Sequence, residues 1–231
     1  AGELMNSGGI SRRIIDMAQA WVGHIRGGLG YVAIGAAVLM ASLSGSAAAD
    51  TAALGMVLLP MMKRAGYLPG NSVGLIATGG IIAPIIPPSI PFIIFGVASG
   101  VSISKLFLAG IAPGIMMGLA FGLVWWWKSR DVQLTRTEKA TGAEIRHSLK
   151  EGAWALLLPI IIIGGFRSGI FTPTEAGAVA AMYSLLVALF VYREMKLADL
   201  VEVLFAAAET TAIVMLLVAA SAVSAFLITI A

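Results

Sequence analysis

An uncharged segment interrupted by prolines constrains the fold of this chain more than any other feature. From Ser72 to Ser104 there is no charged residue, and the segment is long enough to cross a bilayer as a helix. Its middle, IAPIIPPSIP, contains four prolines, each of which removes a backbone amide donor and clashes with the preceding helical turn. Non-helical backbone survives at membrane depth only where protein or an aqueous cavity surrounds it. We therefore predict two half-helices joined by an unwound segment, 83–89; a simple kinked helix is the alternative.

The composition places the rest of the chain in a bilayer as well. Hydrophobic residues make up 59% of the sequence and charged residues only 12%, against about 25% in a soluble domain. The chain has no cysteine, which excludes a disulfide framework and thiolate metal sites. It also has no Walker loop, no glycine-rich nucleotide fingerprint and no Cys/His pair, so we predict neither an enzyme nor an ATPase. The basic residues lie between apolar runs, a placement that indicates membrane topology rather than nucleic acid binding.

A second interruption lies between residues 27 and 62. Gly27–Leu43 is apolar, the small polar group Ser44–Ser46 follows, and Thr51–Met62 would form a helix of only about 18 Å. A bilayer core is about 30 Å thick, and Lys63 and Arg64 follow at once. Two short arms around a polar tip predict a re-entrant helical hairpin that enters and leaves the membrane on the same side. Two full crossings are the alternative.

The remaining segments supply further helices. Ser11–Arg26 is amphipathic, which predicts an interfacial helix lying on the membrane. A tryptophan triplet before Lys128 is typical of an interfacial anchor at the end of a span. The other predicted elements are a helix end at 1–9, a span at 106–127, a polar loop at 128–151 with a short helix near 140–149, a helical pair at 152–166 and 174–192, a short amphipathic piece at 196–204 and a final helix at 210–231.

The distribution of basic residues predicts the orientation. If the hairpin arises from the cytoplasmic side, all lysines and arginines except Lys105 and Arg167 fall inside. This obeys the positive-inside rule. The same count would result if the hairpin crossed twice, so charge predicts orientation and does not distinguish the two forms of the hairpin.

The chemistry is expected at the hairpin tip and at the proline-rich break. Serine hydroxyls and freed carbonyls are hard oxygen ligands suited to a small cation, and the C-terminal ends of half-helices add negative dipole character. The free amides and the serine of the second half-helix would receive a substrate carboxylate. A small-residue packing interface is the alternative for the tip. The candidate ligands of Na⁺ are Ser44, Ser46, Asp50, Gly80, Ala83, Ile86 and Pro88, and the candidate substrate-binding residues are Ser46, Pro88 and Ser89.

Three acids lie within apolar segments, where a charge needs a partner. Asp50 follows the hairpin tip, and we expect it to cap the second arm, to neutralise the ion, or both. Glu175 stands in the sequence Thr172-Pro173-Thr174-Glu175, which predicts a threonine N-cap, a proline at the first helical position and a glutamate at the third. Glu209 lies near a membrane end and is expected to reach towards the interface.

Several strings together resemble the large membrane subunit (the M, or DctM-like, subunit) of the TRAP (tripartite ATP-independent periplasmic) transporters. They are AGELMNSGGISRR, SLSGSAAADTAALG, GGIIAPIIPPSIPFIIFG followed by VSISKLFLAGIAPG, and SGIFTPTEAGAVAA. They occur in the expected order over essentially the whole chain. The combination is specific, although any one string alone would be weak.

This resemblance implies a multi-pass protein of the bacterial inner membrane with two inverted repeats, each containing a hairpin and a broken helix. It implies an elevator that couples Na⁺ to the import of a small organic anion, a sugar acid such as sialic acid or a C4-dicarboxylate. The implied partners are a small membrane (Q) subunit and a periplasmic substrate-binding (P) subunit. A stand-alone sodium/anion symporter of the divalent-anion type remains an alternative, and an ion channel module is a second.

On this basis we divide the chain into four parts and expect it to be a piece of a longer protein. The second hairpin and the second ion site would follow residue 231, which lies inside an apolar run. The parts are 1–26, a helix end with an arm helix of the scaffold; 27–104, the hairpin and broken helix of the transport core; 105–151, a span and a cytoplasmic loop; and 152–231, the start of a second inverted repeat.

Overall fold

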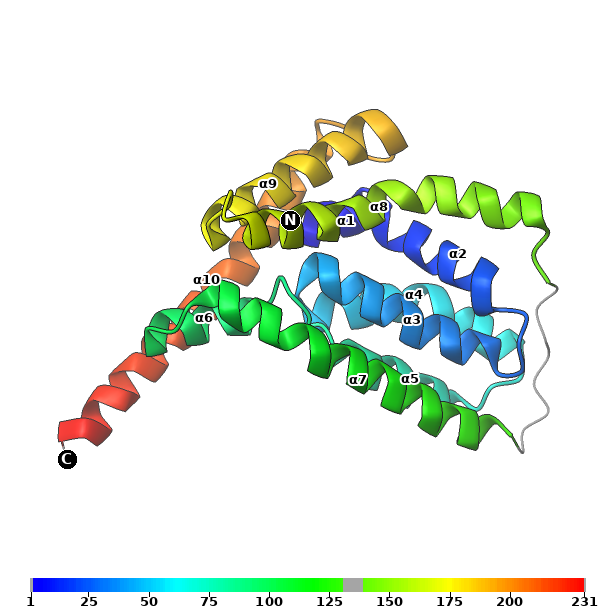
Figure 1. Ribbon diagram of the computed structural model, residues 1–231, viewed down its shortest axis with the longest axis horizontal. Coiled ribbons are helices and arrows are strands. Elements are labelled where there is room, and N and C mark those ends of the chain that lie inside the picture. The colour runs from blue at the N-terminus through cyan, green and yellow to red at the C-terminus, as the bar shows by residue number, and fades with distance from the viewer. Residues whose placement is uncertain (1, 131–138, 231) are drawn as a thin grey trace.

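Every regular element in the part of the chain that the structure describes, residues 2–130 and 139–230, is a helix (Figure 1). The structure is a computed structural model. In chain order the helices are α1 (Gly2–Ser7), α2 (Ile10–Val22), α3 (Gly28–Ser44), α4 (Ala47–Arg64), α5 (Pro69–Gly80), α6 (Ile90–Ser99), α7 (Ile103–Ser129), α8 (Gly142–Ser168), α9 (Pro173–Leu186), the π-helix η1 (Val187–Tyr192) and α10 (Asp199–Ile230). Stretches in α7, α8, α9 with η1, and α10 are long and apolar enough to cross a membrane. The prediction of an all-α integral membrane protein is therefore confirmed.

Helix α3 forms the centre of the bundle. It packs against α2, α4, α5 and α7 (Figure 1). Its buried residues include Ala33, Ala36, Ala37 and Ala41, and such small side chains let neighbouring backbones approach closely. On the side of α5, a Cβ atom added to Gly79 would lie 3.1 Å from the Cβ atom of Ala37. The first arm of the predicted hairpin is therefore also the core of the fold.

The predicted helical hairpin is confirmed. Helices α3 and α4 pack against each other and are joined by Gly45 and Ser46 alone. The second arm begins earlier than predicted, at Ala47, and ends at Arg64 rather than at Met62. The reason is that Ser46 already caps α4, so the alanines that follow it belong to the helix. The position of the hairpin relative to the bilayer stays a prediction.

The predicted break is also confirmed. Helix α5 ends at Gly80 and α6 begins at Ile90, and the residues between them form turns and bends. A single kinked helix is therefore wrong for this segment. The irregular stretch starts two residues earlier than the predicted 83–89, and α6 ends at Ser99, where Gly100 adopts a positive φ of 70°.

Two predicted interruptions are wrong. Helix α8 runs without a break from Gly142 to Ser168 and includes both the short helix expected near 140–149 and the span expected at 152–166. Helix α10 likewise joins the pieces expected at 196–204 and 210–231, beginning at Asp199. In neither junction does the sequence contain a proline, and most of the residues there are good helix formers. The rest of the polar loop expected at 128–151 includes residues 131–138, which lie outside the described part.

Helix α2 is amphipathic, as predicted, but it is more enclosed than a helix lying on a membrane. It packs between α3 and α8 (Figure 1), with Ile14 and Ile15 fully buried. On its polar side, Arg13 pairs with Glu194 at 2.8 Å, and its guanidinium lies 3.7 Å from the centre of the Tyr192 ring. These contacts tie α2 to the end of η1. The helix ends at Val22 instead of continuing to Arg26.

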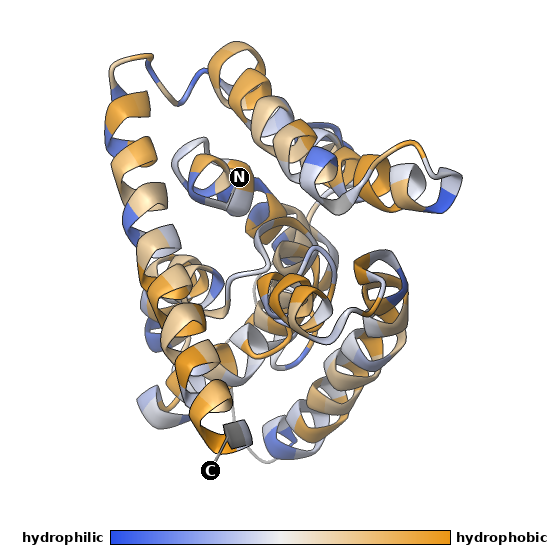
Figure 2. Ribbon diagram, turned by 90° about the vertical axis from the view of Figure 1, so that its left-hand side faces the viewer, coloured by the Kyte–Doolittle hydropathy of each residue, from blue (hydrophilic) through white to orange (hydrophobic). Residues whose placement is uncertain are grey.

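Helix α10 differs from the other long helices in its packing. None of its most apolar membrane-length window is buried within the described chain. Figure 2 shows apolar residues along most of its length. A helix that is apolar all round is one that lipid or other protein surrounds, which agrees with its assignment as a membrane span.

Candidate functional site

The hairpin tip is built by three residues with different backbone conformations. Ser44 is the last residue of α3, Gly45 adopts a left-handed conformation with φ 62°, and Ser46 is extended. A glycine takes a positive φ without the steric cost that a Cβ atom brings. The Ser46 hydroxyl accepts a hydrogen bond from the Ala49 amide at 3.4 Å and so caps α4. The tip therefore brings the end of one helix and the start of the next within a few residues.

Asp50 is the acid of this tip, and it is 1% exposed. The Ser44 hydroxyl donates a hydrogen bond to its Oδ1 atom at 2.5 Å. The same hydroxyl oxygen accepts from the Ser46 amide at 3.1 Å. No described residue donates a hydrogen bond to the buried Oδ2 atom of Asp50. A buried carboxylate oxygen without a partner is unfavourable, and a cation ligand is a role that would satisfy it.

The prediction that Asp50 caps the second arm is wrong. The N-cap of α4 is Ser46, whose hydroxyl binds an amide of the first turn. Asp50 lies four residues past this N-cap, inside the helix, and its carboxylate accepts a hydrogen bond from the Ser44 hydroxyl instead. By contrast, the predicted cap at Thr172 and Glu175 is confirmed, since each side chain binds the backbone amide of the other.

The broken helix contains carbonyl groups that are free of hydrogen bonds and one serine hydroxyl that is already hydrogen-bonded. Among the described residues, none donates a hydrogen bond to the carbonyl oxygens of Ala83, Ile86 or Pro88. Ser89 is fully buried; its hydroxyl donates to the Pro84 carbonyl and accepts from the Phe92 amide at 3.3 Å. Ser89 thus caps α6. Its hydroxyl proton is in use, so a role in binding substrate stays a prediction that requires this bond to open.

The tip and the break touch each other at two glycines. A Cβ atom on Gly45 would overlap the carbonyl oxygen of Pro88, so the tip backbone lies directly against the break. A Cβ atom on Gly80 would overlap the Thr51 hydroxyl and lie 3.2 Å from the Ala47 carbonyl oxygen. The end of α5 therefore lies against the first turn of α4. Both contacts require glycine because the approaching atoms leave no room for a side chain.

The other two predicted ligands, Ala83 and Ile86, are buried within the bundle. Ala83 is fully buried, and with Ile82, Ile86 and Ala41 it forms a small apolar cluster beneath α7. The Ile86 side chain fills the space where Gly114 of α7 has none. These side chains anchor the break in the bundle, so that only their backbone carbonyls are available for a ligand role. The structure thus brings Pro88 to the tip at Ser44 and Gly45, and Gly80 to Ala47 and Thr51 at the start of α4.

A cavity of about 230 Å³ opens beside the tip and the break. Ser44 and Pro88 line it. Its lining also includes Phe107 of α7, Ile162 of α8 and Ala176 of α9, which lie far from the tip in the sequence. No pattern along the chain marks these three residues as cavity lining, although the small residues of EAGAVAA indicate a close helix contact. Thr51 is a further neighbour of the site that the sequence did not indicate.

The whole chain, residues 1–231, matches the family described as the tripartite ATP-independent periplasmic transporter, DctM component. The chain belongs to this family. The resemblance found in the sequence is therefore confirmed, and the family places the chain in the bacterial inner membrane, as predicted. The relatives are permeases, which confirms that the chain is not an enzyme.

Three curated relatives show the range of the family. The full chain aligns with 54% of the 2,3-diketo-L-gulonate TRAP transporter large permease protein of Escherichia coli (strain K12), and the aligned residues are 64% identical. For a C4-dicarboxylate TRAP transporter large permease protein of Pseudomonas aeruginosa, the alignment covers 99% of the chain and 54% of the relative, with 42% identity. For a sialic acid TRAP transporter large permease protein of Vibrio cholerae, it covers 94% of the chain and 51% of the relative, with 43% identity. The chain spans about half the length of these relatives.

Proposed function

We propose that the full-length protein is a secondary transporter that couples Na⁺ to the import of a small organic anion. The observation that carries this proposal is the hairpin tip: a buried carboxylate, oriented by the Ser44 hydroxyl, has an oxygen without a hydrogen-bond partner. Beside it lies the break, whose Pro88 carbonyl touches the tip backbone. Carboxylate, hydroxyl and carbonyl oxygens are the ligands that hard cations take in proteins.

In this proposal the ion organises the substrate site. A cation held by Asp50 and by free carbonyls of the break, those of Ala83, Ile86 or Pro88, would link the hairpin to the broken helix. The N-terminus of α6, capped by Ser89, would then present its amides to a carboxylate. The cavity beside Ser44 and Pro88 supports this placement. The Ser46 hydroxyl oxygen accepts a hydrogen bond from the Ala49 amide and keeps a second lone pair with which it would bind the ion.

The re-entrant hairpin and the elevator mechanism belong to the same proposal. Hairpin and broken helix form one packed unit with α3 at its centre, and α2 joins this unit to α1 and α8. A unit of this kind could move as a body against a scaffold that includes α1, α8 and α10. The large aliphatic surface of α10 supports a membrane position for the scaffold.

We propose a sugar acid as the substrate, because the diketogulonate permease is 64% identical while the C4-dicarboxylate and sialic acid permeases are 42% and 43% identical. The names of all these relatives refer to TRAP systems, which supports a small membrane subunit and a periplasmic substrate-binding protein as partners. A stand-alone symporter and a channel are the rival functions.

Counterflow in proteoliposomes tests this function. The full-length protein and its small subunit are reconstituted with unlabelled 2,3-diketo-L-gulonate inside, and labelled substrate with the binding protein is added outside. A carrier exchanges the two, so we expect the label to accumulate transiently above equilibrium, and only with Na⁺ present.

A label that only equilibrates would indicate a channel and contradict the proposal. Accumulation at the same rate without the binding protein would instead indicate a stand-alone symporter. Vesicles that contain the small subunit alone are the control.

A further inference from the structure

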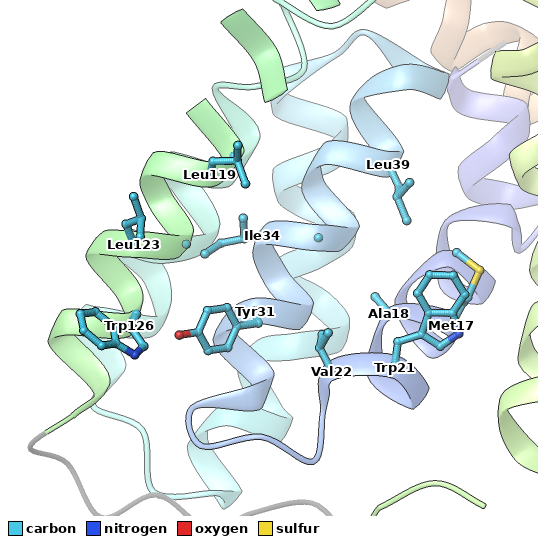
Figure 3. Close-up of a pocket in the computed structure, with 13 residues that line it drawn as sticks. Met17, Ala18, Trp21, Val22, Tyr31, Ile34, Leu39, Leu119, Leu123 and Trp126 are labelled. Carbon is cyan, nitrogen blue, oxygen red and sulfur yellow. The ribbon is translucent and has the colours of Figure 1, made fainter. Parts of the chain in front are cut away.

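An apolar groove lies between α2, α3 and α7 (Figure 3), and none of the tip residues lines it. Its volume is about 770 Å³. Figure 3 shows Met17 and Trp21 of α2 at one wall and Leu119 and Leu123 of α7 at the other. Helix α3 forms the floor. The groove is a feature of three helices that the proposed transport site does not use.

The groove is open because some of the residues that line it are glycines, which have no side chain. Gly35 of α3 and Gly122 of α7 line the groove, and a Cβ atom added to either would meet no atom within 4 Å. Gly118, one turn before Gly122, is different: its Cβ atom would lie 2.8 Å from the Val38 side chain, where α3 and α7 cross. The groove is therefore open space between helices that are themselves in close contact.

The lining excludes a polar occupant. The side chains are aliphatic or aromatic, and the polar atoms among them are the Tyr31 hydroxyl and the indole nitrogens of Trp21 and Trp126. Water in such a groove would have almost no hydrogen-bond partners. A hydrocarbon chain would fill it at no desolvation cost, because lipid tails are as apolar as leucine.

Positive charge is concentrated at one end of the groove. Arg130, just after α7, places its guanidinium 4.7 Å from the centre of the Trp126 ring, and Trp126 lines the groove. Arg26, in the turn between α2 and α3, donates a hydrogen bond to the Arg130 carbonyl oxygen. Trp21 and Tyr31 lie towards the same end (Figure 3). Aromatic and basic residues together mark the interfacial level of a membrane protein, where anionic headgroups lie.

We propose that this groove binds a membrane phospholipid with an anionic headgroup, with one acyl chain against α3 and the phosphate at Arg26 and Arg130. A transmembrane helix from another protein is the competing occupant, since Gly118 and Gly122 form a small-xxx-small pair. The structure favours the lipid for two reasons. Gly118 is already used in the contact with α3, and the basic end offers a partner for a phosphate that an apolar helix would lack.

Native mass spectrometry of the full-length protein tests the proposal. The protein, released from a mild detergent, is titrated with phosphatidylglycerol or with phosphatidylethanolamine of the same acyl chains. Two basic residues at the headgroup predict a preference for phosphatidylglycerol of about thirtyfold. Arg130→Gln is expected to reduce that preference about fivefold. Arg146→Gln, on an exposed face of α8, is the matched control and leaves the preference unchanged.

A second pair of variants tests the groove itself. Gly122→Leu places a side chain in the open space and is expected to lower phosphatidylglycerol binding about tenfold or more. A Cβ atom added to Gly164 of α8 also meets no atom within 4 Å, but Gly164 lies outside the groove. Gly164→Leu therefore controls for the change from glycine to leucine in a helix. Gly35→Leu fills the same space from α3 and serves if the first variant does not fold.

Three outcomes would overturn the proposal. One is wild-type phosphatidylglycerol binding in the folded Gly122→Leu or Gly35→Leu protein. Another is equal binding of the two lipids by the wild type. The third is a photocrosslinker at Leu123 that, in native membranes, labels a protein segment rather than a lipid, because the groove would then be a helix-binding surface.

Discussion

Replacing Asp50 by asparagine in the full-length protein is expected to raise the Na⁺ concentration needed for half-maximal uptake by about two to three orders of magnitude. Asparagine keeps the shape of the side chain and can still accept a hydrogen bond from Ser44, but it removes the negative charge beside the proposed ion. An ion pair at about 4 Å contributes roughly 4 kcal/mol at the effective dielectric constant of a protein. The measurement is substrate uptake into proteoliposomes as a function of external Na⁺.

The control for this variant is Glu202→Gln, which removes one negative charge from an exposed position on α10. We expect its Na⁺ dependence to match that of the wild type. If Asp50→Asn and Ser44→Ala both left the Na⁺ dependence of uptake unchanged, the assignment of the hairpin tip as an ion site would be wrong.

The second large effect is expected at the tip glycine. Gly45→Ala should destabilise the full-length protein by about 2–4 kcal/mol, since alanine resists the left-handed backbone and its Cβ atom would overlap the Pro88 carbonyl oxygen. That oxygen belongs to the backbone of the break, so relief requires the hairpin and the broken helix to separate. The measurement is thermal unfolding in detergent, together with Na⁺-dependent uptake by the fraction that folds.

Gly74→Ala on α5 is the matched control, because its added Cβ atom would meet no atom within 4 Å. In a helix this change should be neutral or slightly stabilising. Equal stability of the Gly45→Ala and Gly74→Ala proteins would show that the tip does not lie against Pro88 as described.

The two features that shaped the fold were readable from the sequence because they depend on local chemistry. Prolines at 84, 87 and 88 cannot continue a helix, and Gly45 between two serines permits a tight turn. The hairpin and the half-helices follow from these residues whatever surrounds them. The cap at Thr172 was readable for the same reason, since its partner lies three residues away.

The predictions were wrong where the local sequence has no residue that ends a helix, or where one residue suited two different roles. The change from a polar start to an apolar remainder predicts two elements where α8 is one helix, because no residue between the two parts ends a helix. At the tip, an acid near the start of the second arm predicts a cap at Asp50, whereas the observed hydrogen bond from the Ala49 amide assigns the cap to Ser46. The contact that joins Gly45 to Pro88 depends on how two distant segments pack, which sequence spacing does not report.

The cavity and the groove could not be predicted for a related reason. Phe107, Ile162 and Ala176 come from three helices and share no pattern along the chain. The groove depends on Gly35 and Gly122 facing the same empty space, whereas Gly118, on the same helix as Gly122, is packed against Val38. Whether a glycine makes a helix contact or leaves an open space depends on the arrangement of α2, α3 and α7.

Direct Na⁺ binding to the purified full-length protein tests the central claim most directly. With ²²Na⁺ in a scintillation proximity assay, we expect saturable binding by the wild type and by Glu202→Gln, and a lower stoichiometry or a much weaker affinity in Asp50→Asn. The claim would be contradicted if Asp50→Asn bound ²²Na⁺ with the stoichiometry and affinity of the wild type.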